Sequence, residues 1–526
     1  MAAPGGSVPG SVAEINELVR RSQEEDLVSV VMVPIQSLAR AFREQQNREE
    51  ATQSVFEVFA HILTRQLAAI KVFTENSESG KNEQYETCLQ LIAECFRCLR
   101  NACIQCVKNQ SHIRTVGLID PTVQILQLLR MLRGFESDTL SAAFQCGLQF
   151  LGNLAVGNEE SKDVIWKNAF PDLFLNCLNH LDKKTVTYCC MVLFTCLNGE
   201  RTADLLNHTK GIELAETVVK ICRKEPELDW AFLIVTEQFL KCPDLVSAMY
   251  TKWNSQERII ILELISAKLS DKNQESQAGS DDLAVPVRLM QFLAACFIEK
   301  YMAVLKYASA TEAEDEEALI VIRLLDILCE TTSNHEKFSY LQNSPALVET
   351  TIKLLYETHL AGKQSRNIFT ASQSLSFANH TTHPAVGFKA HLIHLIGNLC
   401  YNNKENQEKE LRSCRELWTL PNTSRHIPPH HWKYLHEVLS QEGNLRHQRS
   451  SPYGPCHLRA ATIGRELQKP EVPHHQVQEQ LLHFNCLVLE PTCTTLISQY
   501  SNTVTTCTIL HYNGVCCYVC SNCVLV

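Results

Sequence analysis

Apolar residues recur along most of the chain at the spacing that places them on one face of an α-helix. In residues 85–107, one such face would hold Leu91, Cys95, Leu99 and Ala102. Further along, the same pattern predicts helices over residues 123–132, 140–156, 170–181 and 186–197. The alternation of apolar and polar positions that is typical of a half-buried strand does not compete with this pattern before residue 480. The pattern therefore predicts an all-α protein.

A short motif occurs three times and marks the units of a repeat. Residues 150–165, FLGNLAVGNEESKDVI, are similar to residues 99–113 and 396–409, and each copy has an asparagine between apolar residues: Asn101, Asn153 and Asn398. The spacing is 52 residues from Asn101 to Asn153 and 43 from Asn153 to Cys196, taken as the next equivalent position. These values bracket the roughly 40 to 47 residues of armadillo and HEAT units. We therefore predict an armadillo/HEAT-like right-handed α-solenoid with an atypical, poorly ordered C-terminal tail.

The repeated asparagines are predicted to have a structural role. Each would lie at the end of a buried helix, where its amide can hydrogen-bond free backbone groups of the neighbouring turn. No nucleophile or base recurs beside them, so we expect no catalytic role. The polar turn after Asn153 leads to Ser161, which is a candidate N-cap of the next, short helix.

Composition and pattern divide the chain into five segments. They are residues 1–31, a disordered lead with a weak helix; 32–361, armadillo-like helical repeats; 362–387, a long polar loop; 388–410, the start of a truncated C-terminal armadillo unit; and 411–526, an atypical and mostly irregular tail. The last unit is expected to stop at Glu410, because a charge there replaces the apolar Ile113 and Ile165 of the earlier copies. Within the tail, only residues 431–439 have a helical pattern.

Composition and charge favour a protein that binds other proteins in the cytoplasm. The 526 residues carry a net charge of −10 and show no basic stripe, so we do not expect nucleic acid as a partner. The N-terminus lacks a secretory signal and no run of 18 apolar residues occurs, which predicts a cytoplasmic chain without a membrane span. The 24 cysteines are accordingly expected to be reduced thiols.

Two patterns suggest metal or catalytic chemistry but favour structural roles. Cys95, Cys98, Cys103 and Cys106 have the residue types of a zinc site, yet a dozen or more residues normally separate two such pairs. We interpret them as small core residues. His391 and His394 share a helix face with no carboxylate near them. No phosphate loop, G-x-S-x-G or H-E-x-x-H motif occurs, so we predict no enzyme activity, catalytic residue, cofactor or metal site.

The tail provides an alternative function. Cys516, Cys517, Cys520 and Cys523 with His511 could bind zinc, and residues 523–526 fit the C-a-a-X prenylation pattern apart from their final Val. A metal-binding or lipid-anchored protein is therefore the second hypothesis. Residues 481–526 combine β-branched residues with low charge, and we expect them to be mobile or wrongly paired.

Four segments of the repeats resemble the ataxin-10 family. They are ECFRCLRNAC (residues 94–103), FQCGLQFLGNLAVGNEESKDVIW (144–166), EEALIVIRLLDILCE (316–330) and GFKAHLIHLIGNLCYNNKENQEK (387–409). The resemblance covers roughly residues 32–409, and residues 411–526 depart from it. It implies an armadillo-type cytoplasmic and perinuclear scaffold without enzyme activity.

The same resemblance carries expectations about partners and place. It implies links to neuronal survival and neurite outgrowth, to cytokinesis at the midbody, and to the centrosome, centriole and cilium basal body. The implied partners are an O-linked N-acetylglucosamine transferase, with stimulation of intracellular O-glycosylation, and G-protein beta subunits. A homo-oligomer is a further candidate assembly.

Overall fold

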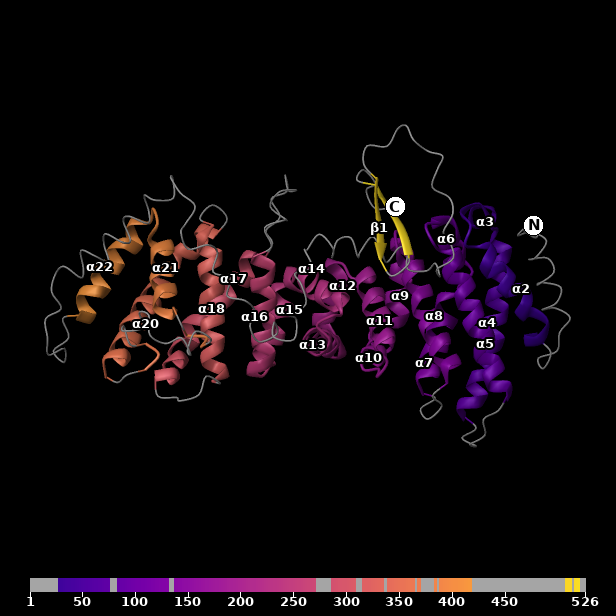
Figure 1. Ribbon diagram of the computed structural model, residues 1–526, viewed down its shortest axis with the longest axis horizontal. Coiled ribbons are helices and arrows are strands. Elements are labelled where there is room, and N and C mark those ends of the chain that lie inside the picture. Colours follow the sequence, from indigo (N-terminus) through magenta and orange to yellow (C-terminus); the bar gives the residue numbers. More distant parts are fainter. Residues whose placement is uncertain are drawn as a thin grey trace. The chain divides into compact units, whose positions relative to one another are not determined.

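The chain folds into stacked α-helices that fall into two compact units (Figure 1). The computed structural model describes residues 27–75, 83–131, 137–270, 285–308, 315–334, 338–364, 367–369, 383–385, 387–418, 507–512 and 515–520. Unit 1 contains residues 1–218, 228–234 and 470–526, and unit 2 contains residues 219–227 and 235–469. The helical repeats confirm the predicted all-α solenoid class.

Unit 1 is built mainly from triplets of helices. Its helices are α2 (Leu27–Ala41), α3 (Gln45–Glu50), α4 (Gln53–Glu75), α5 (Glu83–Ala102), α6 (Val107–Thr115), α7 (Ile119–Met131), α8 (Asp138–Ala155), α9 (Glu159–Ala169), α10 (Asp172–Leu178), α11 (Lys183–Cys196) and α12 (Gly199–Asn207). Helices α13 (Thr209–Lys224) and α14 (Asp229–Glu237) each contain residues of both units. The triplets α3–α5, α6–α8 and α9–α11 are the structural repeats.

Equivalent helices of successive triplets form rows in unit 1. Helices α2, α5, α8 and α11 pack side by side, and α4, α7 and α10 form a second row next to them (Figure 1). Within the first row, the rings of Phe96 in α5 and Phe150 in α8 stack with their centroids 6.2 Å apart. Between the rows, Gly147 permits α8 to lie close to α7, since a Cβ at Gly147 would come within 2.8 Å of Leu126 Cδ2. The core is therefore continuous from one repeat to the next, as a solenoid requires.

Unit 2 has the same kind of arrangement with longer connections. Its elements are the 3₁₀ helix η1 (Phe239–Lys241), α15 (Pro243–Lys252), α16 (Ser255–Ser270), α17 (Val287–Lys300), η3 (Tyr301–Ala308), α18 (Glu316–Ser333), η4 (Ser339–Asn343), α20 (Pro345–Gln364), α21 (Phe388–Cys400) and α22 (Lys404–Trp418). Helices α16, α18 and α21 form one row, and α17, α20 and α22 form the other.

Three helix boundaries differ from the predicted segments. Helix α2 begins at Leu27, before the repeats were expected to start, and α20 continues to Gln364. Helix α22 continues past the predicted end of the unit at Glu410 and reaches Trp418, so the boundary at residue 410 is wrong. Glu405 and Lys409, one turn apart on α22 with Oε1 and Nζ 2.6 Å apart, form an ion pair that supports this helix. The predicted helical pattern at residues 431–439 lies outside the described part of the chain.

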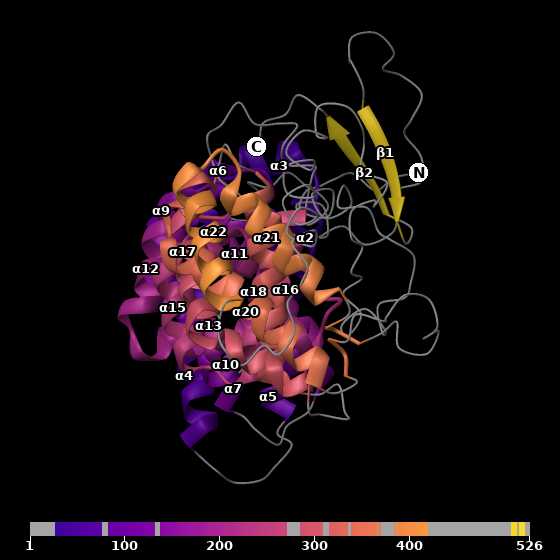
Figure 2. The same cartoon turned by 90° about the vertical axis from the view of Figure 1, so that its left-hand side faces the viewer.

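The described residues of the tail contain one β-hairpin. Strands β1 (Cys507–Tyr512) and β2 (Val515–Cys520) pair antiparallel (Figure 2). Their register places Cys507 opposite Cys520 and His511 opposite Cys516.

A close backbone contact between α12 and α13 gives a test of the fold. A Cβ added at Gly211 would lie 2.4 Å from the carbonyl oxygen of Leu205 and 2.7 Å from its Cα, whereas a Cβ at Gly199 would meet no atom within 4 Å. Because backbone atoms cannot rotate away, we expect Gly211→Ala to lower the free energy of unfolding by about 1 to 3 kcal/mol. The control Gly199→Ala should be neutral or stabilising. Urea unfolding measures both, and equal stability of the two variants would contradict the contact.

Candidate interaction surface

Asparagines at the ends of α5 and α8 connect each helix to the previous one in its row. Asn101 Nδ2 donates to the carbonyl oxygen of Ala39 in α2 at 2.9 Å. Asn153 Nδ2 donates to the carbonyl oxygen of Arg100 in α5 at 3.1 Å. Ala39 and Arg100 lie in the last turns of their helices, where carbonyl groups have no partner within the helix. Each asparagine therefore satisfies a buried helix end across a repeat boundary.

Unit 2 repeats this contact at the end of α21. Asn398 Nδ2 lies 3.3 Å from the carbonyl oxygen of Cys329, 3.1 Å from Thr332 Oγ1 and 3.3 Å from Ser333 Oγ, all near the end of α18. The three asparagines singled out in the sequence thus occupy the same position in three repeats. Their side chains touch backbone and hydroxyl groups of the preceding helix, which is a structural arrangement.

A second asparagine of the motif, in the helix that follows, contacts the preceding repeat. Asn109 Nδ2 donates to the carbonyl oxygens of Arg48 at 2.9 Å and Ala102 at 3.0 Å. Asn406 Nδ2 reproduces this geometry in unit 2 with the carbonyl oxygens of Gln342 at 2.7 Å and Leu399 at 2.8 Å. The same two-way contact therefore joins successive repeats in both units.

Glutamine side chains form further hydrogen bonds to carbonyl oxygens at the ends of the long helices. Gln110 Nε2 donates to the carbonyl oxygens of Asn153 at 2.9 Å and Val156 at 3.0 Å, and Gln407 Nε2 donates to that of Cys400 at 2.9 Å. Sequence reasoning missed Gln342, whose Nε2 donates to the carbonyl oxygens of Asn398 at 2.9 Å and Tyr401 at 3.0 Å. We call this set the amide brace: Asn101, Asn109, Gln110, Asn153, Gln342, Asn398, Asn406 and Gln407.

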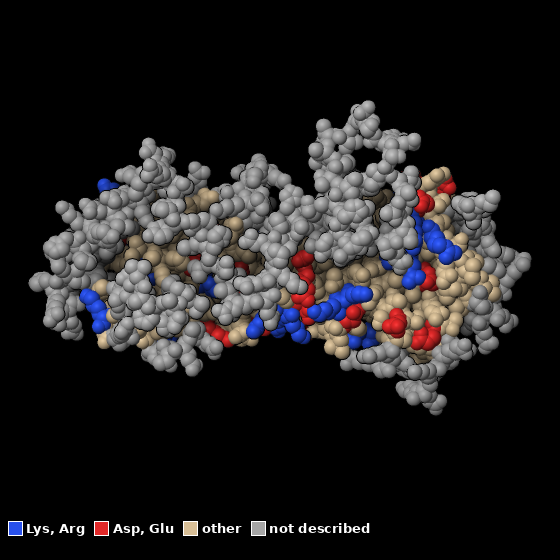
Figure 3. Space-filling view, viewed as in Figure 1, with Lys and Arg blue, Asp and Glu red and all other residues tan. Residues whose placement is uncertain are grey.

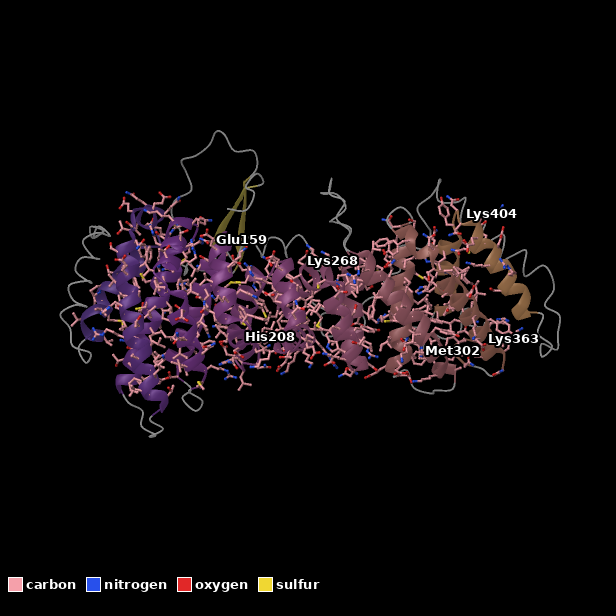
Figure 4. The ribbon with its side chains drawn as sticks, turned by 180° about the vertical axis from the view of Figure 1, so that it is seen from behind. Glu159, His208, Lys268, Met302, Lys363 and Lys404 are labelled. Atoms are coloured by element: carbon pink, nitrogen blue, oxygen red, sulfur yellow. The ribbon has the colours of Figure 1, made fainter. Side chains whose placement is uncertain are left out.

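The predicted N-cap at Ser161 is wrong. Helix α9 begins at Glu159, labelled in Figure 4, and its N-cap is Asn158, whose Oδ1 accepts from the Ser161 amide at 2.9 Å. Ser161 is fully buried at the third residue after the cap. Asn109 and Asn406 hold the same position relative to the caps of α6 and α22. Ser161 therefore takes the place of the brace asparagine, and the polar turn ends three residues earlier than expected.

A charged network occupies the row α16, α18 and α21 in unit 2. His391 Nδ1 lies 2.8 Å from Asp326 Oδ1, and Arg323 lies 3.6 Å from Asp326 and 3.4 Å from Glu263. The hydrogen bond to Asp326 raises the pKa of His391, although burial opposes the shift. Burial raises the pKa of the Glu263 carboxyl. The interpretation that no carboxylate lies near His391 is wrong, because Asp326 comes from another helix.

The equivalent row of unit 1 carries an excess of arginine. On α5, Arg97 pairs with Glu94, and Arg100 Nη1 donates to Gln149 Oε1 of α8 at 2.5 Å. Burial lowers the pKa of the Arg100 guanidinium, and the charges of Arg97 and Arg43 lower it further. Arg43 follows the end of α2, which packs beside α5, and Arg43 and Arg97 are both close enough to Arg100 to lower its pKa.

Comparison with known proteins places the chain in a family. No protein-family model matches it. Ataxin-10 of Xenopus tropicalis is 46% identical over 411 residues, which cover 78% of this chain and 83% of the relative. The chain belongs to the ataxin-10 family. Ataxin-10 of Homo sapiens is 45% identical over 390 residues, covering 73% and 80% of the two chains, and ataxin-10 of Bos taurus is 45% identical over 375 residues, covering 71% and 77%. These relatives confirm the resemblance seen in the four sequence segments.

One solved structure also aligns with this ataxin-10 family member. It is an engineered protein that matches 84% of the chain at 13% identity, with a TM-score of 0.32.

The clustered cysteines of this ataxin-10 family member lie in the core of unit 1. Cys95, Cys98, Cys103 and Cys106 are all buried. Burial raises the pKa of the Cys95, Cys98 and Cys103 thiols, which keeps them protonated. Among the described residues, no group of three or more His, Cys, Asp or Glu side chains is placed to hold a metal ion.

The tail of the ataxin-10 family member is only partly described. Cys516, Cys517 and Cys520 lie on β2, and His511 lies on β1. Cys523, and with it the C-a-a-X pattern, lies outside the described residues. Within the part of the chain that the structure describes, no helix is both long and apolar enough to cross a membrane.

The amide brace predicts which asparagines stabilise the fold. Replacing Asn153→Leu leaves the Arg100 carbonyl without its donor and should lower the free energy of unfolding by about 1 to 3 kcal/mol. Asn207→Leu, at an exposed asparagine that ends α12, is the control and should stay within about 0.5 kcal/mol of the unmodified protein. Thermal or urea unfolding measures both. Equal stability of the two variants would count against the brace.

The His391–Asp326 pair predicts a dependence of stability on pH. The pKa of His391 is raised from its ordinary value of 6.5. The ion pair between protonated His391 and Asp326 therefore stabilises the fold fully below about pH 6.5. The contribution is lost as pH rises through the folded-state pKa. His391→Gln should therefore destabilise the protein more at about pH 5.5 than at about pH 8.5 in urea unfolding. Asp326→Asn should remove the same dependence, and a loss that is equal at both pH values would contradict the ion pair.

Proposed function

We propose that the chain is a non-enzymatic scaffold that binds protein partners through the surfaces of its helix rows. The amide brace carries the proposal, because it fixes the ends of successive helices in both units by the same contacts. The middle turns of those helices are thereby held in register and present side chains at regular intervals. Stacked repeats of this kind typically bind partners over an extended surface.

The state of the reactive side chains supports binding rather than catalysis. Burial raises the pKa of the Cys196 thiol to about 12, and it raises the pKa of the Cys189 thiol well above its ordinary value. Both thiols are therefore poor nucleophiles at neutral pH. On the face drawn in Figure 3, the described Lys and Arg side chains lie among Asp and Glu side chains, a distribution that suits selective contacts with proteins.

Membership of the ataxin-10 family extends the proposal to partners and place. We propose that an O-linked N-acetylglucosamine transferase and G-protein beta subunits are among the partners, and that binding stimulates intracellular O-glycosylation. The proposed sites of action are the perinuclear cytoplasm, the midbody and the base of the centriole and cilium. The proposed processes are neuronal survival, neurite outgrowth and cytokinesis.

The scaffold proposal predicts that affinity is distributed over several repeats. Fragments 1–361 and 1–418 and the full chain would be compared in pull-downs against the two proposed partners, with hydrogen exchange used to check that each fragment is folded. We expect fragment 1–361, which ends before the long loop, to bind at least about tenfold more weakly than 1–418, because contacts that act together multiply affinity. The proposal fails if a fragment of one or two triplets, such as residues 105–198, binds as tightly as 1–418.

A further inference from the structure

Three arginines form a basic surface on the first helix row of unit 1. Arg97 and Arg100 are three residues apart on α5, so their side chains leave the same face of that helix. Arg100 reaches across to Gln149 on α8. Arg43 lies just after α2, the neighbour of α5 on the other side. We call Arg43, Arg97 and Arg100 the α5 arginine surface.

Two of the three arginines of the α5 arginine surface, Arg43 and Arg100, have no ion pair with a described residue. The guanidinium of Arg100 bonds the amide oxygens of Asn101, at 3.2 Å, and Gln149, at 2.5 Å. Arg43 is exposed and its side chain forms no ion pair with a described residue. Glu94 is the carboxylate that pairs with Arg97, and the Arg97 side chain is still 38% exposed. Arg43 and Arg100 thus have no carboxylate within ion-pair distance among the described residues.

The Asp182 carboxylate lies at the start of α11, the helix next to α8, and binds groups of its own helix end. Asp182 caps α11 and accepts from the backbone amides of Lys184 and Thr185, from the Thr185 hydroxyl and from Gln145 Nε2 at 3.0 Å. These hydrogen bonds lower the pKa of Asp182 even though burial opposes them. Asp182 is therefore ionised at neutral pH, but it caps its own helix and forms no ion pair with Arg100.

The equivalent row in unit 2 shows what a balanced surface contains. There Arg323 lies between Glu263 and Asp326, and Asp326 also binds His391. Each cation has a carboxylate partner within 3.6 Å. The two rows share the amide brace but differ in charge, which indicates that the excess in unit 1 is not a requirement of the helix stack.

Arginine near amide and phenol groups suits carboxylates on a protein chain. The guanidinium plane can bind a carboxylate through two parallel hydrogen bonds, and the bond is stronger than one to a neutral amide oxygen. Gln149 and Tyr188, which also bond each other, lie beside the arginines and can contact a peptide backbone. Helices in such a row are roughly 8 to 10 Å apart, so acidic side chains about three residues apart on an extended segment can reach neighbouring helices.

We propose that the α5 arginine surface binds a segment of a partner protein that is rich in glutamate or aspartate. The segment's carboxylates pair with Arg43, Arg97 and Arg100, and the Arg100 guanidinium exchanges an amide partner for a carboxylate. This inference rests on the scaffold function proposed above and specifies the chemistry of one of its surfaces.

Binding of a labelled oligoglutamate peptide to the full chain tests this surface. Fluorescence anisotropy should give saturable binding that weakens as salt is added. The double variant Arg43→Glu with Arg97→Glu should weaken binding by at least about tenfold, because two attractive contacts become repulsive. Arg100 is left unchanged since it also contacts Asn101 and Gln149. The control is Lys252→Glu, an exposed residue at the end of α15, which should bind like the unmodified chain.

Three outcomes would overturn the proposal. They are equal binding by the double variant and the unmodified chain, equally tight binding of an oligonucleotide of the same charge, and absence of peptide binding by the unmodified chain. In the third case, the fragment pull-downs decide separately whether the scaffold function stands. Thermal unfolding of the double variant, compared with that of Lys252→Glu, shows whether lost binding is due to lost structure.

Discussion

The stack depends on hydrogen bonds from side-chain amides to carbonyl groups at the ends of neighbouring helices. A helix that ends inside a stack leaves up to four carbonyl groups without an intrahelical partner, and a buried carbonyl without a donor is destabilising. Asn101, Asn153 and Asn398 supply that donor from the next repeat. Because the donor and the acceptor belong to different repeats, the same bond satisfies a helix end and fixes the distance between two repeats.

The sequence predicts those parts of the brace that recur at a regular spacing. Asn101 and Asn153 could be found because each stands in the same apolar context near the end of a periodic helix. Gln342 could not, since it lies 56 residues before its acceptor Asn398, whereas Gln110 lies 43 before Asn153. The His391–Asp326 pair joins residues 65 apart in sequence, a separation at which sequence pattern carries no information about contact.

Two errors arise where a local rule was applied without its structural context. Serine is a good N-cap, but Asn158 precedes Ser161 and its side chain is free to accept from the Ser161 amide, which moves the cap three residues earlier. Likewise, a charge at Glu410 was taken as the end of the last unit because earlier copies have isoleucine there. Helix α22 instead packs on α20 and α21. Its Asn406, which is 2% exposed, donates to the carbonyl oxygens of Leu399 in α21 and Gln342 in η4.

Because the amide brace stabilises the stack at the helix ends, the side chains on the middle turns of the helices can vary without loss of that stability. The brace residues lie in the last turns of α5, α8 and α21, in the first turns of α6 and α22 and in η4, so their amides are already used. Residues one or more turns earlier, such as Arg97 in unit 1 and His391 in unit 2, are outside the brace. The row of unit 1 can therefore carry an excess of positive charge while that of unit 2 is balanced within itself. Two surfaces of different electrostatic character are compatible with one packing scheme, because that scheme places no demand on the middle turns.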